Sequence, residues 1–408
     1  MVKKIVFWFF GFLVFWLTAD VFSAVNPDKF VRIAIIQDAP SLSLRIKGNF
    51  EVRDLTGKVV LGKGKNLKTQ VIRADTKLIK LSGIEIKSGS FKIIPLGKAQ
   101  AYVNKRVFRG RLNIIRRPEG RGWASYKPEG DGAASDSRSH SPSHKANNSF
   151  LVVNELDIED YVKGILCHEA APWWPREALK AQAVIARSYA VYQKQFTKDK
   201  DFDLTNDIYS QVYGGKTSEK WRTNLAVNST RGKVLVFEGK AFPSYYHATC
   251  SGHTEDAAEL WKIDIAPLKG VECPFCVLSP HFSWEKKIPL AEIKQRLEAK
   301  GHNCPRIETI TISGRNLSGR ITFLKIAGEG KVSEISAKDF RQALNPNIIR
   351  STNFTLEIIA DMVYFKGLGW GHGVGLCQWG MYFMAKKGSK YQDILKYYFP
   401  RTQLVNQL

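Results

Sequence analysis

The chain has 408 residues and a formal net charge of +23, with 44% hydrophobic and 12% aromatic residues. This much apolar material excludes a wholly disordered chain, and the length predicts two or three folding units. The excess of Lys and Arg indicates an acidic partner, such as nucleic acid, an anionic lipid or an acidic polymer. Charge alone does not choose among these partners.

Residues 1–24 are typical of a signal peptide or signal anchor. A short basic start precedes the apolar run Ile5–Ala19, which Asp20 ends before the roughly 20 apolar residues that a membrane span needs. Cleavage after Ala24 would leave the bulky Phe22 at the minus-three place, so an uncleaved tether is the alternative. We therefore expect an exported protein, periplasmic or otherwise extracytoplasmic, near the membrane. This location argues against nucleic acid as a partner.

The rest of the chain predicts an α+β fold. Residues 25–107 show short alternating apolar runs separated by glycines, which is typical of a β-rich region with tight turns. Residues 108–408 have a mixed pattern and form the second predicted domain. Within it, residues 127–149 are polar and rich in Ser, Gly and Asn, which indicates a solvated loop.

Two helices are predicted after this loop, and they frame one acidic residue. Asp157 can cap a helix that carries an apolar stripe, and Glu169 lies at the end of that stripe. Pro172 stops this helix, and Pro175 suits the first turn of the next one. A carboxyl at this place would be partly buried, which raises its pKa as a general acid requires; on spacing alone, an ordinary carboxylate at a helix end is the simpler interpretation of Glu169.

Cysteine and histidine residues gather further along the chain. The spacing His247-x2-Cys250-x2-His253, followed by Cys273-Pro-Phe-Cys276, offers five candidates for the four ligands of a structural zinc ion. Cys250, His253, Cys273 and Cys276 are the favoured set, which leaves His247 surplus. A disulfide is the alternative, since exported thiols can oxidise, and a redox or packing role is the third. Cys167, Cys304 and Cys377 are scattered and suit buried packing.

Four blocks of sequence together resemble the SpoIID/LytB family of stage II sporulation protein D and its relatives. They lie in family order within residues 109–404 and are Val153–Ile165, Glu169–Pro175, Ala178–Tyr189 and Gly369–Gly380. The resemblance implies a lytic transglycosylase that cleaves peptidoglycan strands between N-acetylmuramic acid and N-acetylglucosamine, preferably strands stripped of stem peptides. It also implies that Glu169 is the acid/base and that Arg187 matters, and it makes residues 127–149 a loop insertion between adjacent strands.

Further site residues follow from this resemblance. The family uses a lysine, which here is Lys286 or Lys287, and zinc in some members would make the metal a scaffold with no part in the chemistry. Arg187 could bind a lactyl carboxylate or tune Glu169, and a surface ion pair is the alternative.

The glycine-rich block adds three candidates. His372 lies where backbone can approach a sugar, and Trp370 and Trp379 could stack on pyranose rings; a core histidine fixing a tight turn is the alternative for His372. A second carboxylate, Asp157 or Asp361, would favour ordinary hydrolysis, although Asp157 is more simply a helix cap.

A lytic transglycosylase needs one catalytic carboxyl, because the C6 hydroxyl of the sugar closes a 1,6-anhydro ring. The competing hypothesis is a non-catalytic peptidoglycan-binding protein that enhances a cell-wall amidase. An amidase that removes stem peptides is also an expected partner of the enzyme, in sporulation or in cell division.

Overall fold

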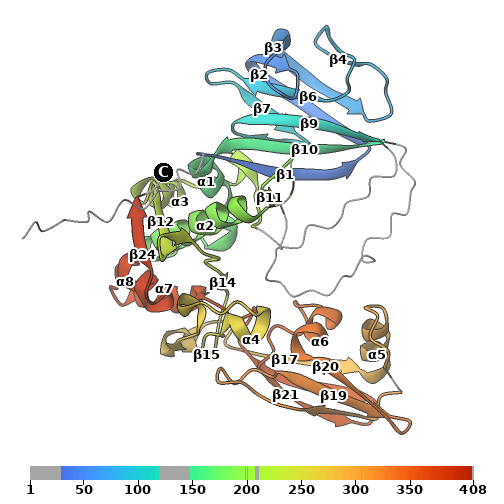
Figure 1. Ribbon diagram of the computed structural model, residues 1–408, viewed down its shortest axis with the longest axis vertical. Helices are drawn as coiled ribbons and strands as arrows, with labels where there is room; N and C mark the ends of the chain where they lie inside the picture. Colours follow the sequence, from blue (N-terminus) through green and yellow to red (C-terminus); the bar gives the residue numbers. More distant parts are fainter. Residues whose placement is uncertain are drawn as a thin grey trace, which may run out of the picture.

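The computed structural model describes residues 29–118, 148–197, 199, 201–206, 211–304 and 306–406. A β-sheet, a helical layer and a second β-rich unit follow one another along the longest axis (Figure 1). The predicted α+β class is confirmed. The predicted signal, residues 1–24, and most of the predicted polar loop lie outside the described residues. Among the helices of the described part, none is long and apolar enough to cross a membrane.

The N-terminal sheet contains nine strands in the order β11-β1-β10-β9-β6-β2-β7-β8, with β3 paired to β2. A small hairpin, β4 and β5, lies beside it. The bounds are β1 Phe30–Ala39, β2 Ser41–Arg53, β3 Val60–Arg73, β4 Ile79–Leu81, β5 Ile84–Ile86, β6 Phe91–Pro95, β7 Gln100–Val103, β8 Arg106–Phe108, β9 Arg111–Pro118, β10 Asn148–Asp157 and β11 Leu204–Thr205.

Strands β9 and β10 flank residues 119–147 and are antiparallel neighbours, with Pro118 opposite Asn148. The two ends of this segment therefore meet at one place on the sheet. The boundary expected after residue 107 falls inside the same sheet, because β8, β9 and β10 all belong to it. The β-rich region and the start of the second predicted domain thus form one structural unit.

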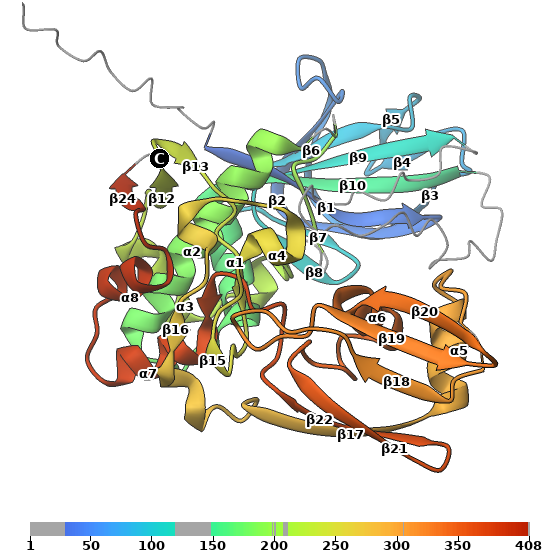
Figure 2. The ribbon, with the colours of Figure 1, turned by 60° about the horizontal axis from the view of Figure 1, so that its bottom comes forward.

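The helical layer packs on this sheet through a shared core. Helix α1 (Ile158–Glu169) begins where expected, with the Asp157 carboxylate accepting a hydrogen bond from the Glu159 amide. Helix α2 (Arg176–Phe196) starts directly after Pro175 and is almost entirely buried, because its many alanines allow neighbouring elements to approach closely. In Figure 2, α2 lies beside α1, between the N-terminal sheet and α7 and α8.

Shorter elements complete this layer. Segments from the last part of the chain return to it, since β24 pairs with β12 and β23 runs parallel to β14. The bounds are η1 Gly215–Ser218, α3 Trp221–Ser229, β12 Lys233–Phe237, β13 Lys240–Ala241, β14 Tyr246–His247, β15 Gly252–His253, α4 Ala257–Trp261, η2 Ala266–Leu268, β16 Glu272–Cys273, η3 Pro274–Leu278, β23 Leu376–Cys377, α7 Gln378–Lys386, α8 Tyr391–Tyr398 and β24 Gln403–Asn406.

Residues 283–368 form a separate unit, which we call the inserted lobe. It has a hydrophobic core of its own, and the chain enters and leaves at adjacent points, where the Gly369 amide donates to the Phe282 carbonyl at 2.8 Å. The sequence patterns did not distinguish this lobe. Its elements are β17 Ser283–Pro289, α5 Leu290–Glu298, β18 Thr309–Ile312, β19 Phe323–Gly328, β20 Lys331–Ser336, α6 Ala337–Leu344, β21 Phe354–Ile359 and β22 Met362–Leu368.

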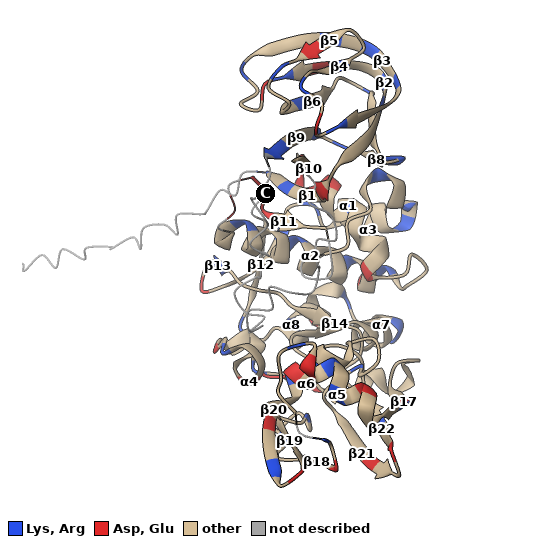
Figure 3. Ribbon diagram, turned by 90° about the vertical axis from the view of Figure 1, so that its right-hand side faces the viewer, with Lys and Arg blue, Asp and Glu red and all other residues tan. Residues whose placement is uncertain are grey.

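Lys and Arg residues, blue on the ribbon of Figure 3, occur in all three units. Many of the basic side chains form ion pairs with neighbouring carboxylates, as Lys92 and Arg111 do with Glu155. The positive charge is therefore distributed over the molecule, which suits a general attraction to an acidic surface better than recognition of one ligand.

Candidate active site

An open cleft of about 280 Å³ lies between the helical layer and the entrance of the inserted lobe. Its walls come from the end of α1, the following turn, the start of α7 and the two connections to the lobe. The lining residues are Glu169, Ala171, Trp173, Trp174, Ala248, His281, Trp370, Gln378 and Trp379. Among these described residues Glu169 is the one carboxylate, and four tryptophans form most of the apolar wall.

Glu169 is the last residue of α1, because Ala170 adopts an extended conformation. The Gln378 side chain donates to the Glu169 backbone carbonyl at 2.9 Å, which fixes this end of the helix against α7. Burial raises the pKa of the Glu169 carboxyl to about 7, while hydrogen bonds from the Tyr246 hydroxyl and the Val212 amide oppose the rise. The negative end of the helix dipole also disfavours a carboxylate here. Glu169 can therefore hold a proton near neutral pH.

Tyr246 is a site residue that the sequence analysis missed. Its hydroxyl accepts a hydrogen bond from the Gln211 amide at 3.1 Å, and Gln211 in turn accepts from Tyr161 at 3.0 Å. The Tyr246 proton is thereby directed at Glu169. Burial and the nearby Glu169 charge raise the pKa of Tyr246 well above its usual value, so the phenol remains a donor. In the sequence Tyr246 directly precedes His247, the first residue of the cysteine-histidine pattern, and this was the signal that could have identified it as a site residue.

The aromatic wall contains both predicted tryptophans, Trp370 and Trp379. The Trp379 ring centroid lies 5.3 Å from that of Trp174, and Trp173 extends the wall with 62% of its surface exposed. His281, a second missed residue, contacts Trp370 edge-on with ring centroids 4.7 Å apart. A partly exposed tryptophan wall beside a proton donor suits a sugar ring, and contact with one stays a prediction.

His372 does not line the cleft. One ring nitrogen accepts from the Val374 amide at 3.1 Å, and the other donates to the Tyr246 carbonyl at 3.0 Å. Burial, together with the Arg341 charge, lowers the pKa of His372 to about 3, so the ring is neutral. The structure thus favours the alternative of a histidine that fixes a turn, and His372 acts by holding the carbonyl of Tyr246.

Arg187 does not line the cleft, and its ion pair is buried and does not lie on the surface; a contribution of Arg187 to catalysis stays a prediction. The guanidinium is 0% exposed and forms a two-point ion pair with Glu159, with nitrogen–oxygen distances of 2.9 and 2.7 Å. It donates further to the Lys233 carbonyl at 3.0 Å, and Glu159 accepts from the Gly232 amide. The pair ties α1 and α2 to the turn before β12. Arg187 lies on the face of α2 that packs against α1 and the start of β12, so its side chain points into the core.

Replacing Arg187 with Met should lower the free energy of unfolding by about 3–5 kcal/mol, because Glu159 would be left buried without its cation. Urea unfolding monitored by tryptophan fluorescence measures the change. The matched control is the double variant Arg187→Met with Glu159→Leu, which should lose less stability because it removes both charges. A fully stable Arg187→Met chain that fails only in catalysis would contradict this structural role.

The other predicted residues lie elsewhere. Lys286 and Lys287 are exposed on β17 of the inserted lobe, and neither lines the cleft. Asp157 caps α1, which was the simpler of the two roles expected for it. Asp361 lies in the inserted lobe, where its backbone carbonyl accepts a hydrogen bond from the Leu290 amide. Neither aspartate lines the cleft as a second carboxylate.

Four buried cysteines form the candidate metal site. The sulfur atoms of Cys250, Cys273, Cys276 and Cys377 all lie within 4.8 Å of one another. Those of Cys250 and Cys276 are 3.6 Å apart, close to the edge of about 3.8 Å that a tetrahedron with Zn–S bonds of about 2.3 Å requires. The four are free thiols, so the structure favours the metal interpretation over a disulfide. A closed set of four thiolate ligands fits structural zinc.

The favoured ligand set needs one correction, because Cys377 takes the place of His253. The parallel pairing of β23 with β14 brings Cys377 to the cluster, where its sulfur accepts from the Cys250 and Gly380 amides at 3.3 Å. His253 instead bonds the Thr254 carbonyl. His247 is buried with one nitrogen bonded to the Val374 carbonyl, so it too lies outside the group.

Family models match two regions of the chain. A family model described as stage II sporulation protein (SpoIID) matches residues 146–237, and a domain of unknown function, DUF8618, matches residues 277–375, which include the inserted lobe. An uncharacterized protein of Brachyspira hyodysenteriae is 40% identical over 263 residues, covering 64% of this chain and 70% of that protein.

Two relatives from Bacillus subtilis carry functional names. An amidase enhancer is 26% identical over 297 residues, covering 60% of this chain and 40% of its own. Stage II sporulation protein D is 31% identical over 267 residues, covering 62% of this chain and 75% of its own. The chain therefore belongs to the stage II sporulation protein D family.

Proposed function

We propose that the protein is a peptidoglycan lytic transglycosylase acting on strands of N-acetylmuramic acid and N-acetylglucosamine, preferably strands already stripped of peptides. The observation that carries this proposal is the position of Glu169, which among the described residues is the one carboxyl that lines a cleft walled by tryptophans, where burial raises its pKa to about 7. A hydrolase would normally place a second carboxylate in the cleft to activate water. The membership in the stage II sporulation protein D family supports the same substrate class.

In the proposed reaction, protonated Glu169 gives its proton to the glycosidic oxygen as the bond to C1 of the muramic residue breaks. The C6 hydroxyl of the same sugar then attacks C1, and the Glu169 carboxylate accepts the hydroxyl proton. The products are a 1,6-anhydro-muramic end and a new free hydroxyl on the departing sugar, and Glu169 is returned to its acid form. Tyr246 holds the carboxyl in position throughout.

The metal has a structural role in this proposal. Cys250, Cys273, Cys276 and Cys377 would hold zinc, which supplies folding stability and leaves no open position for chemistry when four thiolates bind it. The cluster would hold the strand pair β14 and β23, from which Tyr246 contacts Glu169 and the start of α7 reaches the cleft. We further propose export through residues 1–24, which would bring the enzyme to its substrate.

The alternative function is a peptidoglycan-binding enhancer of a cell-wall amidase, which the similarity to an amidase enhancer favours. One assay distinguishes the two. Incubating the purified exported region with peptide-free glycan strands should release 1,6-anhydro-muramic products, detected by mass spectrometry. Strand binding without any anhydro product would exclude the enzyme, and products with reducing muramic ends would indicate a hydrolase.

Replacing Tyr246 with Phe should move the alkaline limb of the pH profile of kcat/KM to higher pH. The Tyr246 hydroxyl stabilises ionised Glu169, so its loss raises the pKa of Glu169 above about 7 and keeps the acid protonated in more alkaline solution. Tyr397→Phe, which removes a hydroxyl bonded to the Glu272 carbonyl, serves as control. A limb that does not move, or that moves to lower pH, would refute the proposed contact.

A further inference from the structure

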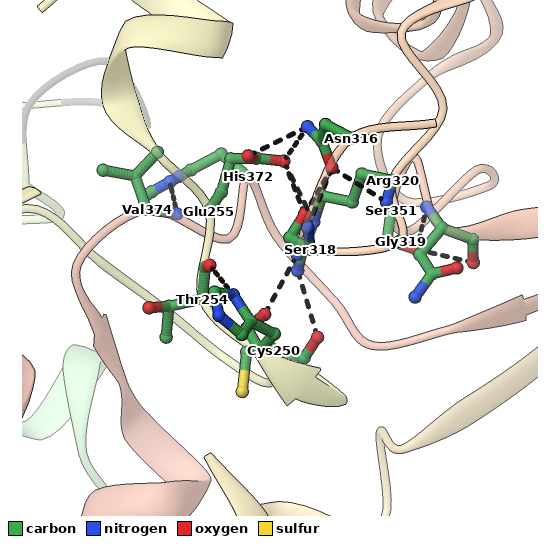
Figure 4. Close-up of polar contacts among 12 residues, drawn as sticks. Cys250, Thr254, Glu255, Asn316, Ser318, Gly319, Arg320, Ser351, His372 and Val374 are labelled. Carbon is green, nitrogen blue, oxygen red and sulfur yellow. Dashed lines mark hydrogen bonds and ion pairs between the residues drawn. The ribbon is translucent and has the colours of Figure 1, made fainter. Parts of the chain in front are cut away.

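The inserted lobe contacts the cysteine cluster through one arginine. Arg320 is 1% exposed and donates to the backbone carbonyls of Cys250 and His253, both at 3.1 Å (Figure 4). These carbonyls belong to the segment 250–276, which we call the metal loop because it supplies three of the four cysteines. A side chain of the lobe thus holds the backbone of a candidate metal ligand.

A second set of contacts fixes the same interface. Glu255 of the metal loop is 3% exposed and accepts hydrogen bonds from the Asn316 amide at 3.0 and 2.9 Å and from the Ser318 hydroxyl at 2.9 Å. Asn316 also accepts from the Ser318 and Arg320 amides, so the turn 316–320 is held in shape before it meets the loop. Figure 4 shows these side chains converging on Glu255 from the lobe.

The charges of this interface match a thiolate metal centre. Four thiolates around Zn²⁺ leave two net negative charges, which are costly to bury without a neighbouring cation. Arg320 is a buried cation beside the cluster, with its Nε 4.0 Å from Glu255 and its two terminal nitrogens bonded to carbonyls of the metal loop. Such second partners of a metal ligand set its orientation and its affinity for the ion.

The same interface determines one wall of the cleft. Trp370 follows the last strand of the lobe, and its backbone pairs with Thr249, directly before Cys250, at 3.0 and 2.9 Å. His281 precedes the first strand of the lobe. The Gly369 amide donates to the Phe282 carbonyl and so holds the two connections to the lobe together. A shift of the lobe against the metal loop would therefore displace both Trp370 and His281.

We propose that Arg320 is a positioning residue that couples metal binding by the four cysteines to the attachment of the inserted lobe, and thereby to the shape of the cleft. Metal in the cluster would stabilise the docked lobe, and by linkage a docked lobe would raise the affinity for metal. This coupling concerns binding and conformation, so it does not depend on the proposed glycan cleavage.

Zinc affinity of the full chain tests the proposal. Competition with a chromogenic chelator should show that Arg320→Gln binds zinc about 10–100-fold more weakly than the unaltered protein, the range typical for loss of an outer partner of a metal ligand. Arg320→Lys keeps the positive charge but loses the planar group that donates to two carbonyls at once. Its zinc affinity should therefore lie between those of Arg320→Gln and the unaltered protein. Arg296→Gln is the matched control, because Arg296 bonds within the lobe, to Glu292 and the Leu344 carbonyl.

Hydrogen exchange supplies the second readout. In zinc-loaded Arg320→Gln the amides of residues 369–374 should exchange faster than in the unaltered chain, while those of β9 and β10 remain protected and show that the protein is folded. Unchanged zinc affinity with unchanged exchange in a folded Arg320→Gln chain overturns the proposal. If Arg320→Gln unfolds, the same two measurements are made on Arg320→Lys and on the double variant Asn316→Ala with Ser318→Ala. Unchanged zinc affinity and unchanged exchange in both of these variants would also overturn the proposal.

Discussion

Replacing Glu169 with Gln should reduce kcat for release of 1,6-anhydro-muramic products by about 10²–10⁴-fold, the usual contribution of a general acid or base. Gln keeps the size of the side chain and its contact with Tyr246, but it has no acidic proton to give. Mass spectrometry of digests of peptide-free strands measures the loss. Glu177→Gln, which alters a partly exposed carboxylate bonded to Lys180 on α2, is the control for a general effect of charge.

The same variant should change stability in a pH-dependent way. A carboxyl with a pKa of about 7 in the folded protein, raised from 4.5, favours folding less as the pH rises, because the ionised form is poorly solvated. Glu169→Gln should therefore match the unaltered chain near pH 4 and exceed its free energy of unfolding by about 3 kcal/mol near pH 8. Equal stabilities at both pH values would mean that Glu169 has an ordinary pKa.

Replacing Cys377 with Ser should abolish stoichiometric zinc binding and cost more than about 4 kcal/mol of folding free energy, since the binding energy of a structural zinc is part of the folding energy. Metal analysis of the purified chain and thermal unfolding with and without a chelator measure both effects. Cys304→Ser is the matched control, because Cys304 is a buried free thiol of the lobe, outside the cluster.

Two results would contradict the metal interpretation. Zinc bound at full stoichiometry by Cys377→Ser would place the ligands elsewhere. A mass two hydrogens lower than that of the fully reduced chain, lost on treatment with a reductant, would instead show a disulfide among the cysteines. Recovery of folding when Zn²⁺ is added after the chelator would support the structural role.

Local patterns in the sequence were enough for the parts of the fold governed by short-range physics. The Asp157 cap, the apolar stripe of α1 and the start of α2 after Pro175 all follow from neighbouring residues. Glu169 could be placed at the end of α1 for the same reason. Its partial burial was expected from that position, whereas its partners were not, because Tyr246 and Gln378 reach it from distant segments.

The remaining differences between the predictions and the structure concern contacts between segments that are distant in the sequence. Three cysteines were found from their short spacing, whereas Cys377 joins them through the pairing of β23 with β14. The sequence position of Arg187 could not show that its face of α2 meets Glu159 and not the cleft. The inserted lobe was missed because its composition resembles that of the surrounding chain, and its ends meet only in three dimensions.

The return of residues 376–406 to the helical layer has a consequence for how the molecule is assembled. Cys377 completes the cysteine cluster, and β24 pairs with β12, so both the metal site and the small sheet around β12 are incomplete until the last described segment is in place. Contacts between such distant parts of a chain form slowly, because long loops must close first. A chain in which only the earlier segments have folded has neither a finished cluster nor a finished cleft. Any proteolytic loss before residue 377 would leave three thiols exposed to oxidation and a Glu169 without the α7 contact that holds it.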